Sequence, residues 1–210
     1  QKETSDKMAE YDFEKMQKKL QKYLDEDRFQ HTLGVMYTCA ALAMAHGYDM
    51  KDAQAAGLLH DCAKCIPNKK KLKLCENNCI SVTEFEKEHP FLLHAKLGAF
   101  IAKEKYGIKN EDILSSIRFH TTGKPEMSLL EKIVYIADYI EPRRDKASNL
   151  ARMRYLAFQD LDQTMYEILA GTINYLKGKG SCIDPMTIQT FTWFEKLIQE
   201  KCSAAEAKGE

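Results

Sequence analysis

Six ionisable side chains stand in segments whose neighbours are largely apolar: His31, His60, Asp61, His94, His120 and Asp138. His60 and Asp61 are adjacent at the end of the apolar run 53–59, and Asp138 interrupts the apolar run 133–140. A buried imidazole or carboxylate is costly unless it is paired, hydrogen-bonded or bound to a metal. One metal site would explain all six residues, because helical bundles build such sites from imidazoles and carboxylates that face a common cavity.

Each of the six also has an ordinary structural explanation. A lone histidine on an apolar face is more often hydrogen-bonded than a ligand, and a lone aspartate can cap a helix or pair with arginine. That explanation must be invoked six separate times, so we favour the metal site. His46 and His89 stay outside the argument, because the first marks a helix end and the second precedes a proline at a turn.

The elements that must position these residues are predicted to be helices. Apolar residues recur at steps of three and four, and no alternating pattern predicts a strand of useful length. Gly34, three residues after His31, is expected to let another helix come close, and residues 68–90 are the least regular stretch. The predicted helices cover residues 11–24, 28–45, 52–66, 90–106, 110–120, 128–140, 150–176 and 184–200. We therefore expect one all-α domain of eight or nine helices over residues 12–200, with a disordered segment 1–11 and a frayed tail 201–210.

Composition limits the class of protein. The 210 residues carry 31 Lys+Arg and 31 Asp+Glu, a balance that argues against a generally basic nucleic-acid binder. No window approaches the ~18–20 consecutive apolar residues of a membrane span. Seven cysteines, an odd number, and the lack of a signal peptide at the start indicate reduced thiols in a cytoplasmic protein.

The order His31, His60-Asp61, Asp138 resembles the HD-domain metal-dependent phosphohydrolases. Much of the chain is similar to their bacterial YqeK branch, the symmetrical bis(5′-nucleosyl)-tetraphosphatases. The resemblance covers roughly residues 12–200 and is carried by the stretches 31–35, 56–64, 89–95, 117–125 and 127–144. One departure is 145–149, where such proteins carry an aromatic-Pro-Gly turn, so we expect one edge of the pocket to differ.

The resemblance implies a principal metal held by four residues: His31, His60, Asp61 and Asp138. His94 and His120 would line the same cavity, either as ligands of a second metal through Asp61 or as partners of a phosphate. Mixed nitrogen and oxygen ligands suit transition metals better than magnesium. The family resemblance points to iron, with manganese, cobalt or zinc as alternatives, in one or two ions.

The implied reaction is symmetrical cleavage of a dinucleoside tetraphosphate, such as diadenosine tetraphosphate, into two ADP by attack of metal-bound water. The implied catalytic residues are Asp61, Lys64, His94 and His120. The implied substrate contacts are His31, Lys64, His94, His120, Thr121, Asp138 and Arg144. Lys64 shares a helical face with His60 and Asp61, although it could be a solvated charge at a helix end. The planar guanidinium of Arg144 suits phosphate, although Arg143 and Arg144 could instead pair with Glu141 or Asp145 on the surface. A homodimer is expected by resemblance and base rate.

Other interpretations stay open at this point. Cys62-x₂-Cys65 with Cys75-x₃-Cys79 could hold structural zinc, and the lysines at 69–73 could bind RNA, but buried thiols and a solvated loop are favoured. Another HD-type specificity (deoxynucleotide, guanosine tetraphosphate or cyclic nucleotide) and a non-catalytic nucleotide sensor are the functional alternatives.

Overall fold

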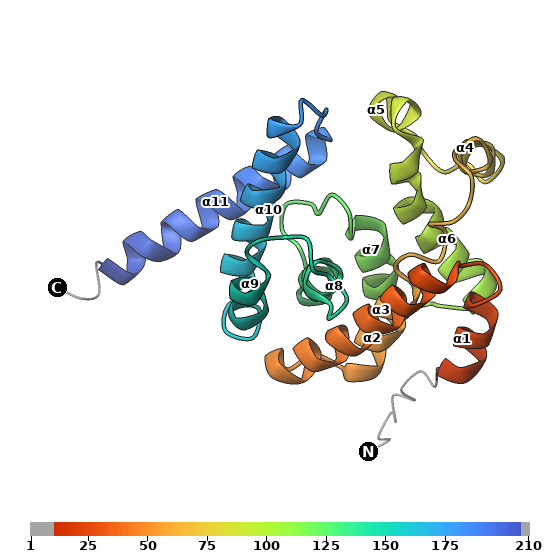
Figure 1. The fold of residues 1–210 in the computed structure, drawn as a ribbon, viewed down its shortest axis with the longest axis horizontal. Helices are drawn as coiled ribbons and strands as arrows, with labels where there is room; N and C mark the ends of the chain where they lie inside the picture. The colour runs from red at the N-terminus through yellow and green to blue at the C-terminus, as the bar shows by residue number, and fades with distance from the viewer. Residues whose placement is uncertain (1–10, 207–210) are drawn as a thin grey trace, which may run out of the picture.

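The computed structural model describes residues 11–206, and every regular element there is a helix (Figure 1). The elements are α1 (Phe13–Leu20), α2 (Glu26–His46), α3 (Met50–Leu59), α4 (Asn68–Asn77), α5 (Glu84–Glu88), the 3₁₀ helix η1 (Pro90–Leu93), α6 (His94–Tyr106), α7 (Glu111–Phe119), α8 (Leu129–Ile140), α9 (Leu150–Leu156), α10 (Leu161–Gly178) and α11 (Pro185–Glu206). The all-α prediction is confirmed. The segment 1–10 and residues 207–210, which were predicted to be disordered or frayed, lie outside the described residues, whereas 201–206 continue α11.

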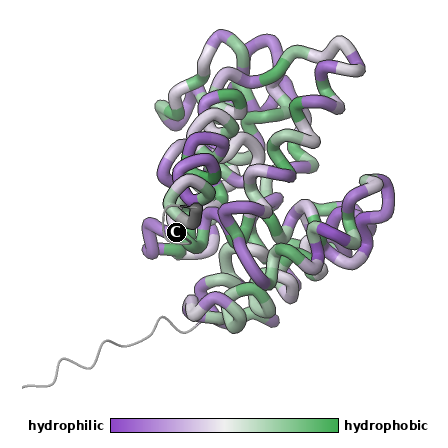
Figure 2. Tube along the Cα trace, turned by 90° about the vertical axis from the view of Figure 1, so that its left-hand side faces the viewer, coloured by the Kyte–Doolittle hydropathy of each residue, from purple (hydrophilic) through white to green (hydrophobic). Residues whose placement is uncertain are grey.

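Four helices form the centre of the fold. α2 packs on α3 and α8, and α7 packs on α3 and α8, so the four enclose a common core. Its fully buried side chains include Val35, Leu58, Leu59, Ile117 and Ile133. α4, α5 and α6 lie on one side of this centre, and α9, α10 and α11 lie on the other (Figure 1). Apolar and polar residues alternate along the helical turns (Figure 2), as in helices that each bury one face.

Several helix ends form where the sequence predicts them. The Asn110 side chain caps α7, and Ser128 with Glu131 forms a complete capping box at the start of α8. Gly47 and Gly107 end α2 and α6 in the left-handed conformation, which glycine adopts without steric cost. Within residues 11–206, no helix is both long and apolar enough to cross a membrane.

The number of helices is larger than predicted, because two helices were missed and one predicted helix is divided; another predicted helix is shorter than expected. The irregular stretch 68–90 contains α4 and α5; α4 buries Lys71 and Cys75, and a capping box of Thr83 and Glu86 begins α5. The predicted helix 150–176 is two helices, because the Asp160 carboxylate accepts hydrogen bonds from the backbone at the start of α10. The predicted helix 52–66 ends at Leu59, and residues 60–65 form turns.

The cysteines do not form the zinc site that was weighed as an alternative. All seven are free thiols, and Cys62 and Cys75 are buried whereas Cys65 and Cys79 are exposed. The Cys62 thiol donates to Gly98 O, and the Cys65 thiol donates to a carboxylate. In the described part of the chain, the groups of side chains that could hold a metal contain histidine and aspartate and no cysteine.

Candidate metal centre

The six residues singled out by their apolar surroundings meet at one place in the fold, between the central helices. His31 lies on α2 and Asp138 on α8, whereas His60 is the C-cap residue of α3 and Asp61 follows it. His94 joins η1 to α6, and His120 is the C-cap residue of α7. Five of the six are buried, and the Asp138 side chain is 22% exposed.

Three of the imidazoles are oriented in the same way. Each Nδ1 donates to the backbone carbonyl three residues earlier: His60 to Gly57 at 2.7 Å, His94 to Phe91 at 2.6 Å and His120 to Ile117 at 2.7 Å. A carbonyl oxygen only accepts, so Nδ1 carries the proton in the neutral ring. The lone pair of each Nε2 is therefore free for a ligand.

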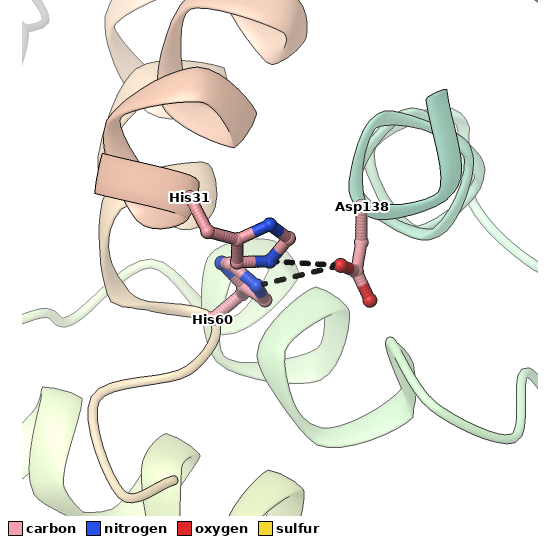
Figure 3. Close-up of side chains that lie close together, drawn as sticks. All are labelled: His31, His60 and Asp138. Atoms are coloured by element: carbon pink, nitrogen blue, oxygen red, sulfur yellow. Dashed lines mark ion pairs between the residues drawn. The ribbon is translucent and has the colours of Figure 1, made fainter. Parts of the chain in front are cut away.

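His31, His60 and Asp138 form a first cluster. His31 Nε2 lies 3.0 Å and His60 Nε2 3.9 Å from the same oxygen, Asp138 Oδ1 (Figure 3). Neither His31 Nε2 nor His60 Nε2 has a hydrogen-bond partner within residues 11–206. The contact between His31 Nε2 and Asp138 Oδ1 is thus short, but its geometry is not that of a hydrogen bond. The other ring nitrogen of His31, Nδ1, lies 3.0 Å from Glu141 Oε1.

Asp61, His94 and His120 form a second cluster. Asp61 Oδ1 lies 3.2 Å from His94 Nε2 and 3.4 Å from His120 Nε2, and these two nitrogens are 3.1 Å apart. The other carboxylate oxygen, Oδ2, is 3.6 Å from His60 Nε2, so Asp61 faces both clusters. Two lone pairs this close repel each other unless a cation or a donor lies nearby.

Lys64 and Thr121, two of the expected substrate contacts, border the second cluster. Lys64 Nζ lies 3.1 Å from His94 Nε2 and 3.6 Å from Asp61 Oδ1. Thr121 Oγ1 lies 3.3 Å from both His94 Nε2 and His120 Nε2. An ammonium and a hydroxyl thus stand beside the two facing imidazoles.

The electrostatics of the centre keep His60 and His94 neutral and keep Asp61 and Asp138 ionised. Burial lowers the pKa of His60 and of His94 to about 4. Burial raises the pKa of Asp61, but the surrounding imidazoles lower it by more, so that it lies well below its ordinary value. Burial likewise raises the pKa of Asp138, but His31, His60 and Arg144 together lower it by more, so that it lies below its ordinary value. Neutral imidazole and ionised carboxylate are the forms that bind metals.

A transition metal fits this donor set. Metal–nitrogen and metal–oxygen bonds of about 2.1 Å place neighbouring ligand atoms about 3 Å apart. The distances between ligand atoms in the two clusters run from 3.0 to 3.9 Å, at or somewhat above that value. Two groups of three residues are close enough to share one ion: one is His31, His60 and Asp138, and the other is His60, Asp61 and His120. The partnerless polar atoms buried here, His31 Nε2, His60 Nε2 and Asp61 Oδ1, would each gain a partner from a bound cation.

Two residues at the site escaped the sequence analysis as functional candidates. Arg28 Nη1 lies 2.9 Å from Asp61 Oδ2, and Glu141 contacts His31. Arg28 precedes His31 by three residues, a spacing that puts both on one helical face, and this signal was available. Glu141 is 110 positions from His31, a separation from which no spacing rule predicts contact.

The arginines after α8 are positioned differently from each other. Arg144 Nη2 lies 2.9 Å from Asp138 Oδ1, and its Nε donates to the Asp138 carbonyl at 3.1 Å. The Arg143 side chain pairs with Asp27 instead, and within residues 11–206 neither guanidinium forms an ion pair with Asp145. A cavity of about 370 Å³ opens beside His31 and is lined by Asp25, Asp27, Arg28, His31, Glu141, Arg143, Arg144, Asp145 and Lys146.

Comparison with known proteins gives consistent matches. The model of the HD domain family matches residues 28–143. The symmetrical bis(5′-nucleosyl)-tetraphosphatase of Halalkalibacterium halodurans is 40% identical over 179 residues, covering 85% of this chain and 94% of the relative. The protein of the same name from Bacillus subtilis is 38% identical and covers 81% of this chain and 90% of the relative.

A solved structure agrees with these matches. The crystal structure of a predicted HD superfamily hydrolase involved in NAD metabolism, from Clostridium acetobutylicum, superimposes with a TM-score of 0.86 at 38% identity. The match covers 90% of this chain and 99% of that one. The similarity therefore extends over nearly the whole fold.

Proposed function

Because this chain belongs to the HD domain family, and within it to the symmetrical bis(5′-nucleosyl)-tetraphosphatases, we propose that it hydrolyses dinucleoside tetraphosphates to two nucleoside diphosphates. The observation that carries the proposal is the pair of histidine–aspartate clusters that share Asp61 and are flanked by Lys64, Arg28 and Arg144. Metal ligands beside fixed cations are what hydrolysis of a phosphoanhydride requires.

The first role of the chain is to hold the metal. His31, His60, Asp61 and Asp138 would bind one ion, and His94 and His120 would either complete a second site through Asp61 or contact a phosphate. A bound divalent ion supplies a water of lowered pKa and polarises a phosphoryl oxygen. The carbonyls of Gly57, Phe91 and Ile117 fix the rings of His60, His94 and His120, so their lone pairs are oriented before any ion arrives.

The second role is to balance the charge of the polyphosphate. The Lys64 ammonium stands beside the second cluster, where it would contact a phosphoryl oxygen at the reacting centre. Arg144 is about half exposed at the mouth of the cavity, and its planar guanidinium can bind phosphate oxygens in pairs. Thr121 adds a hydroxyl donor beside His94 and His120. These groups would stabilise the negative charge that develops on the attacked phosphoryl group and on the leaving nucleoside diphosphate.

Product analysis tests the proposal. The purified protein, loaded with iron or manganese, is incubated with diadenosine tetraphosphate, and the nucleotides are separated by chromatography. We expect ADP alone, and AMP with ATP would contradict symmetrical cleavage. Asp61→Asn should remove turnover, whereas Asp162→Asn, a similarly ion-paired carboxylate on α10, should keep it.

A panel of other nucleotides distinguishes the alternatives. Deoxynucleotides, guanosine tetraphosphate and cyclic nucleotides are assayed under the same conditions, with metal content measured by mass spectrometry. Faster turnover of one of these would reassign the substrate. Tight nucleotide binding without turnover under any metal would favour the sensor.

Three finer predictions belong to the same proposal. We propose iron as the metal, on the mixed nitrogen and oxygen donors and the family resemblance, and metal analysis of protein purified without oxygen tests it. A homodimer stays a prediction that light scattering can test. The cytoplasmic location stays a prediction too, and seven free cysteines are compatible with it.

A further inference from the structure

Glu141 is a buried carboxylate with two different hydrogen-bond partners. Its side chain is 2% exposed, Oε1 lies 3.0 Å from His31 Nδ1, and Oε2 accepts from the Arg143 backbone N–H at 2.8 Å. An ionised carboxylate is acceptor-only, so both oxygens are used, and the neutral His31 ring carries its proton on Nδ1. The lone pair of His31 Nε2 then faces Asp138.

Gly34 provides the space that this carboxylate occupies. A Cβ at position 34 would lie 2.6 Å from Glu141 Oε2, closer than real contacts of this kind. The colliding atom is the end of a side chain, so a methyl group here would displace the carboxylate and leave the backbone in place. The small residue predicted to admit a neighbouring helix therefore admits the Glu141 side chain.

The turn after α8 depends on the same carboxylate. Oε2 of Glu141 holds the Arg143 N–H, and the Glu141 carbonyl accepts from the Arg144 N–H at 3.0 Å. From this turn the Arg144 guanidinium contacts the side chain and the carbonyl of Asp138. One side chain thus touches the His31 ring and the turn that presents the proposed phosphate-binding arginine.

We infer that Glu141 is a positioning residue that fixes the Nδ1–H tautomer of His31 for metal binding and holds the turn that carries Arg144, in a space kept open by Gly34. The inference rests on the metal-binding role of His31 in the proposed function. Outer carboxylates that orient a ligating histidine raise metal affinity, and their loss costs about 10–100-fold.

Glu141→Gln is the sharpest test, because glutamine keeps the shape but has only one acceptor oxygen. If that oxygen serves His31, the NH₂ group faces the Arg143 N–H, donor against donor. If it serves Arg143, the NH₂ group donates to His31 Nδ1 and moves the ring proton to Nε2, where it blocks the metal. We expect manganese affinity to fall about 10–100-fold. In the metal-free protein at alkaline pH, where the His31 ring has lost its second proton, ¹⁵N NMR of His31 should show loss of the pure Nδ1–H form or displacement of the Arg143 amide.

Glu131→Gln is the matched control. Glu131 lies on α8, is equally buried at its side chain and caps that helix, away from His31. This variant should lose stability but keep wild-type manganese affinity and an unchanged His31 tautomer. A Glu141→Gln protein with wild-type affinity, tautomer and Arg143 amide shift would overturn the inference.

A double-mutant cycle tests the role of Gly34. Gly34→Ala should weaken manganese binding in the wild type by displacing Glu141, but should change it little in a Glu141→Ala background, where no carboxylate is left to displace. If Gly34→Ala weakened manganese binding equally in both backgrounds, Gly34 would not be the residue that leaves room for the Glu141 side chain. The NMR readout needs neither metal nor substrate, so failure of the tetraphosphatase activity and failure of this inference are distinguishable.

Discussion

Arg28 Nη1 lies 2.9 Å from Asp61 Oδ2, whereas the other oxygen of that carboxylate faces the imidazoles of His94 and His120. The guanidinium is the nearest formal positive charge to a carboxylate that is buried almost completely. In the protein without metal, Arg28 therefore compensates a charge that a bound ion would also compensate.

Replacement of Arg28 should consequently make folding more dependent on metal. Arg28→Met keeps the apolar stem and removes the charge, which should lower the stability of the metal-free protein by about 1–2 kcal/mol. Added manganese should raise the melting temperature of the variant by more than that of the wild type. Arg152→Met, in an exposed pair with Glu167, is the control. If manganese raised the melting temperature of Arg28→Met and of the wild type equally, the result would argue against this compensation.

Lys64 is expected to act on the rate rather than on the metal. Lys64→Ala should lower kcat by about 100-fold, since it removes a fixed charge beside the reacting phosphate. Metal content, measured by mass spectrometry, should remain at the wild-type value. Lys69→Ala, an exposed lysine on α4, should have no effect on either quantity. Loss of metal in the Lys64 variant would instead indicate that the ammonium holds the metal ligands in place.

Arg144 is expected to act on substrate affinity. Arg144→Ala should raise KM for the tetraphosphate by about tenfold, because a charged hydrogen bond to phosphate is lost. Stability should change little, since the guanidinium is 47% exposed and its pair with Asp138 is screened. Arg152→Ala should leave KM unchanged. A lower kcat at constant KM would place Arg144 at the reacting phosphorus.

The stability of the metal-free protein should fall as the pH is lowered from about 6.5 towards 4. The pKa of His60 and of His94 is about 4 in the folded protein, whereas an exposed histidine in the unfolded chain has a pKa of 6.5. The unfolded chain therefore binds more protons in this window. Each ring can contribute at most about 3 kcal/mol. The pKa of His31 is raised, so its contribution to stability changes mainly above pH 6.5, outside this window.

Urea denaturation of the chelator-treated protein at pH 7, 6 and 5 measures this effect. The carboxylates do not contribute strongly there, because the pKa of Asp61 and of Asp138 is lowered and their window lies at more acidic pH. His94→Gln should reduce the fall in stability by about half, since one of the two titrating rings is removed. Constant or rising stability between pH 7 and 5 would refute the buried neutral form of these histidines.

Local signals were sufficient to predict much of the fold. Asn110, Ser128, Gly47 and Gly107 mark helix ends through contacts within a few residues, and all four act as predicted. The break between α9 and α10 has a comparable signal in Asp160, which was hidden by the continuous apolar pattern on both sides. α4 was missed because its lysines suppress the apolar periodicity, although Lys71 itself is buried.

The site was predictable where residue type conflicted with surroundings. Asp61 in an apolar run and Asp138 within another attracted attention because burial of a charge needs a partner. Glu141 gave no such conflict, since a glutamate beside a proline at a helix end looks like a surface residue. Its burial arises from the packing of α2 on α8, a tertiary relationship that composition and spacing do not contain.

The hydrogen bonds from His60, His94 and His120 to carbonyls three residues earlier bear on whether these histidines could be grafted into other helical proteins. Each ring takes a carbonyl close to it in sequence, where one helical turn ends, so its orientation is encoded within four residues. A tetrapeptide ending in histidine could therefore be moved to the end of another helix with its ring alignment intact. Metal centres in designed bundles could be assembled from such portable units, leaving only the distances between helices to be engineered.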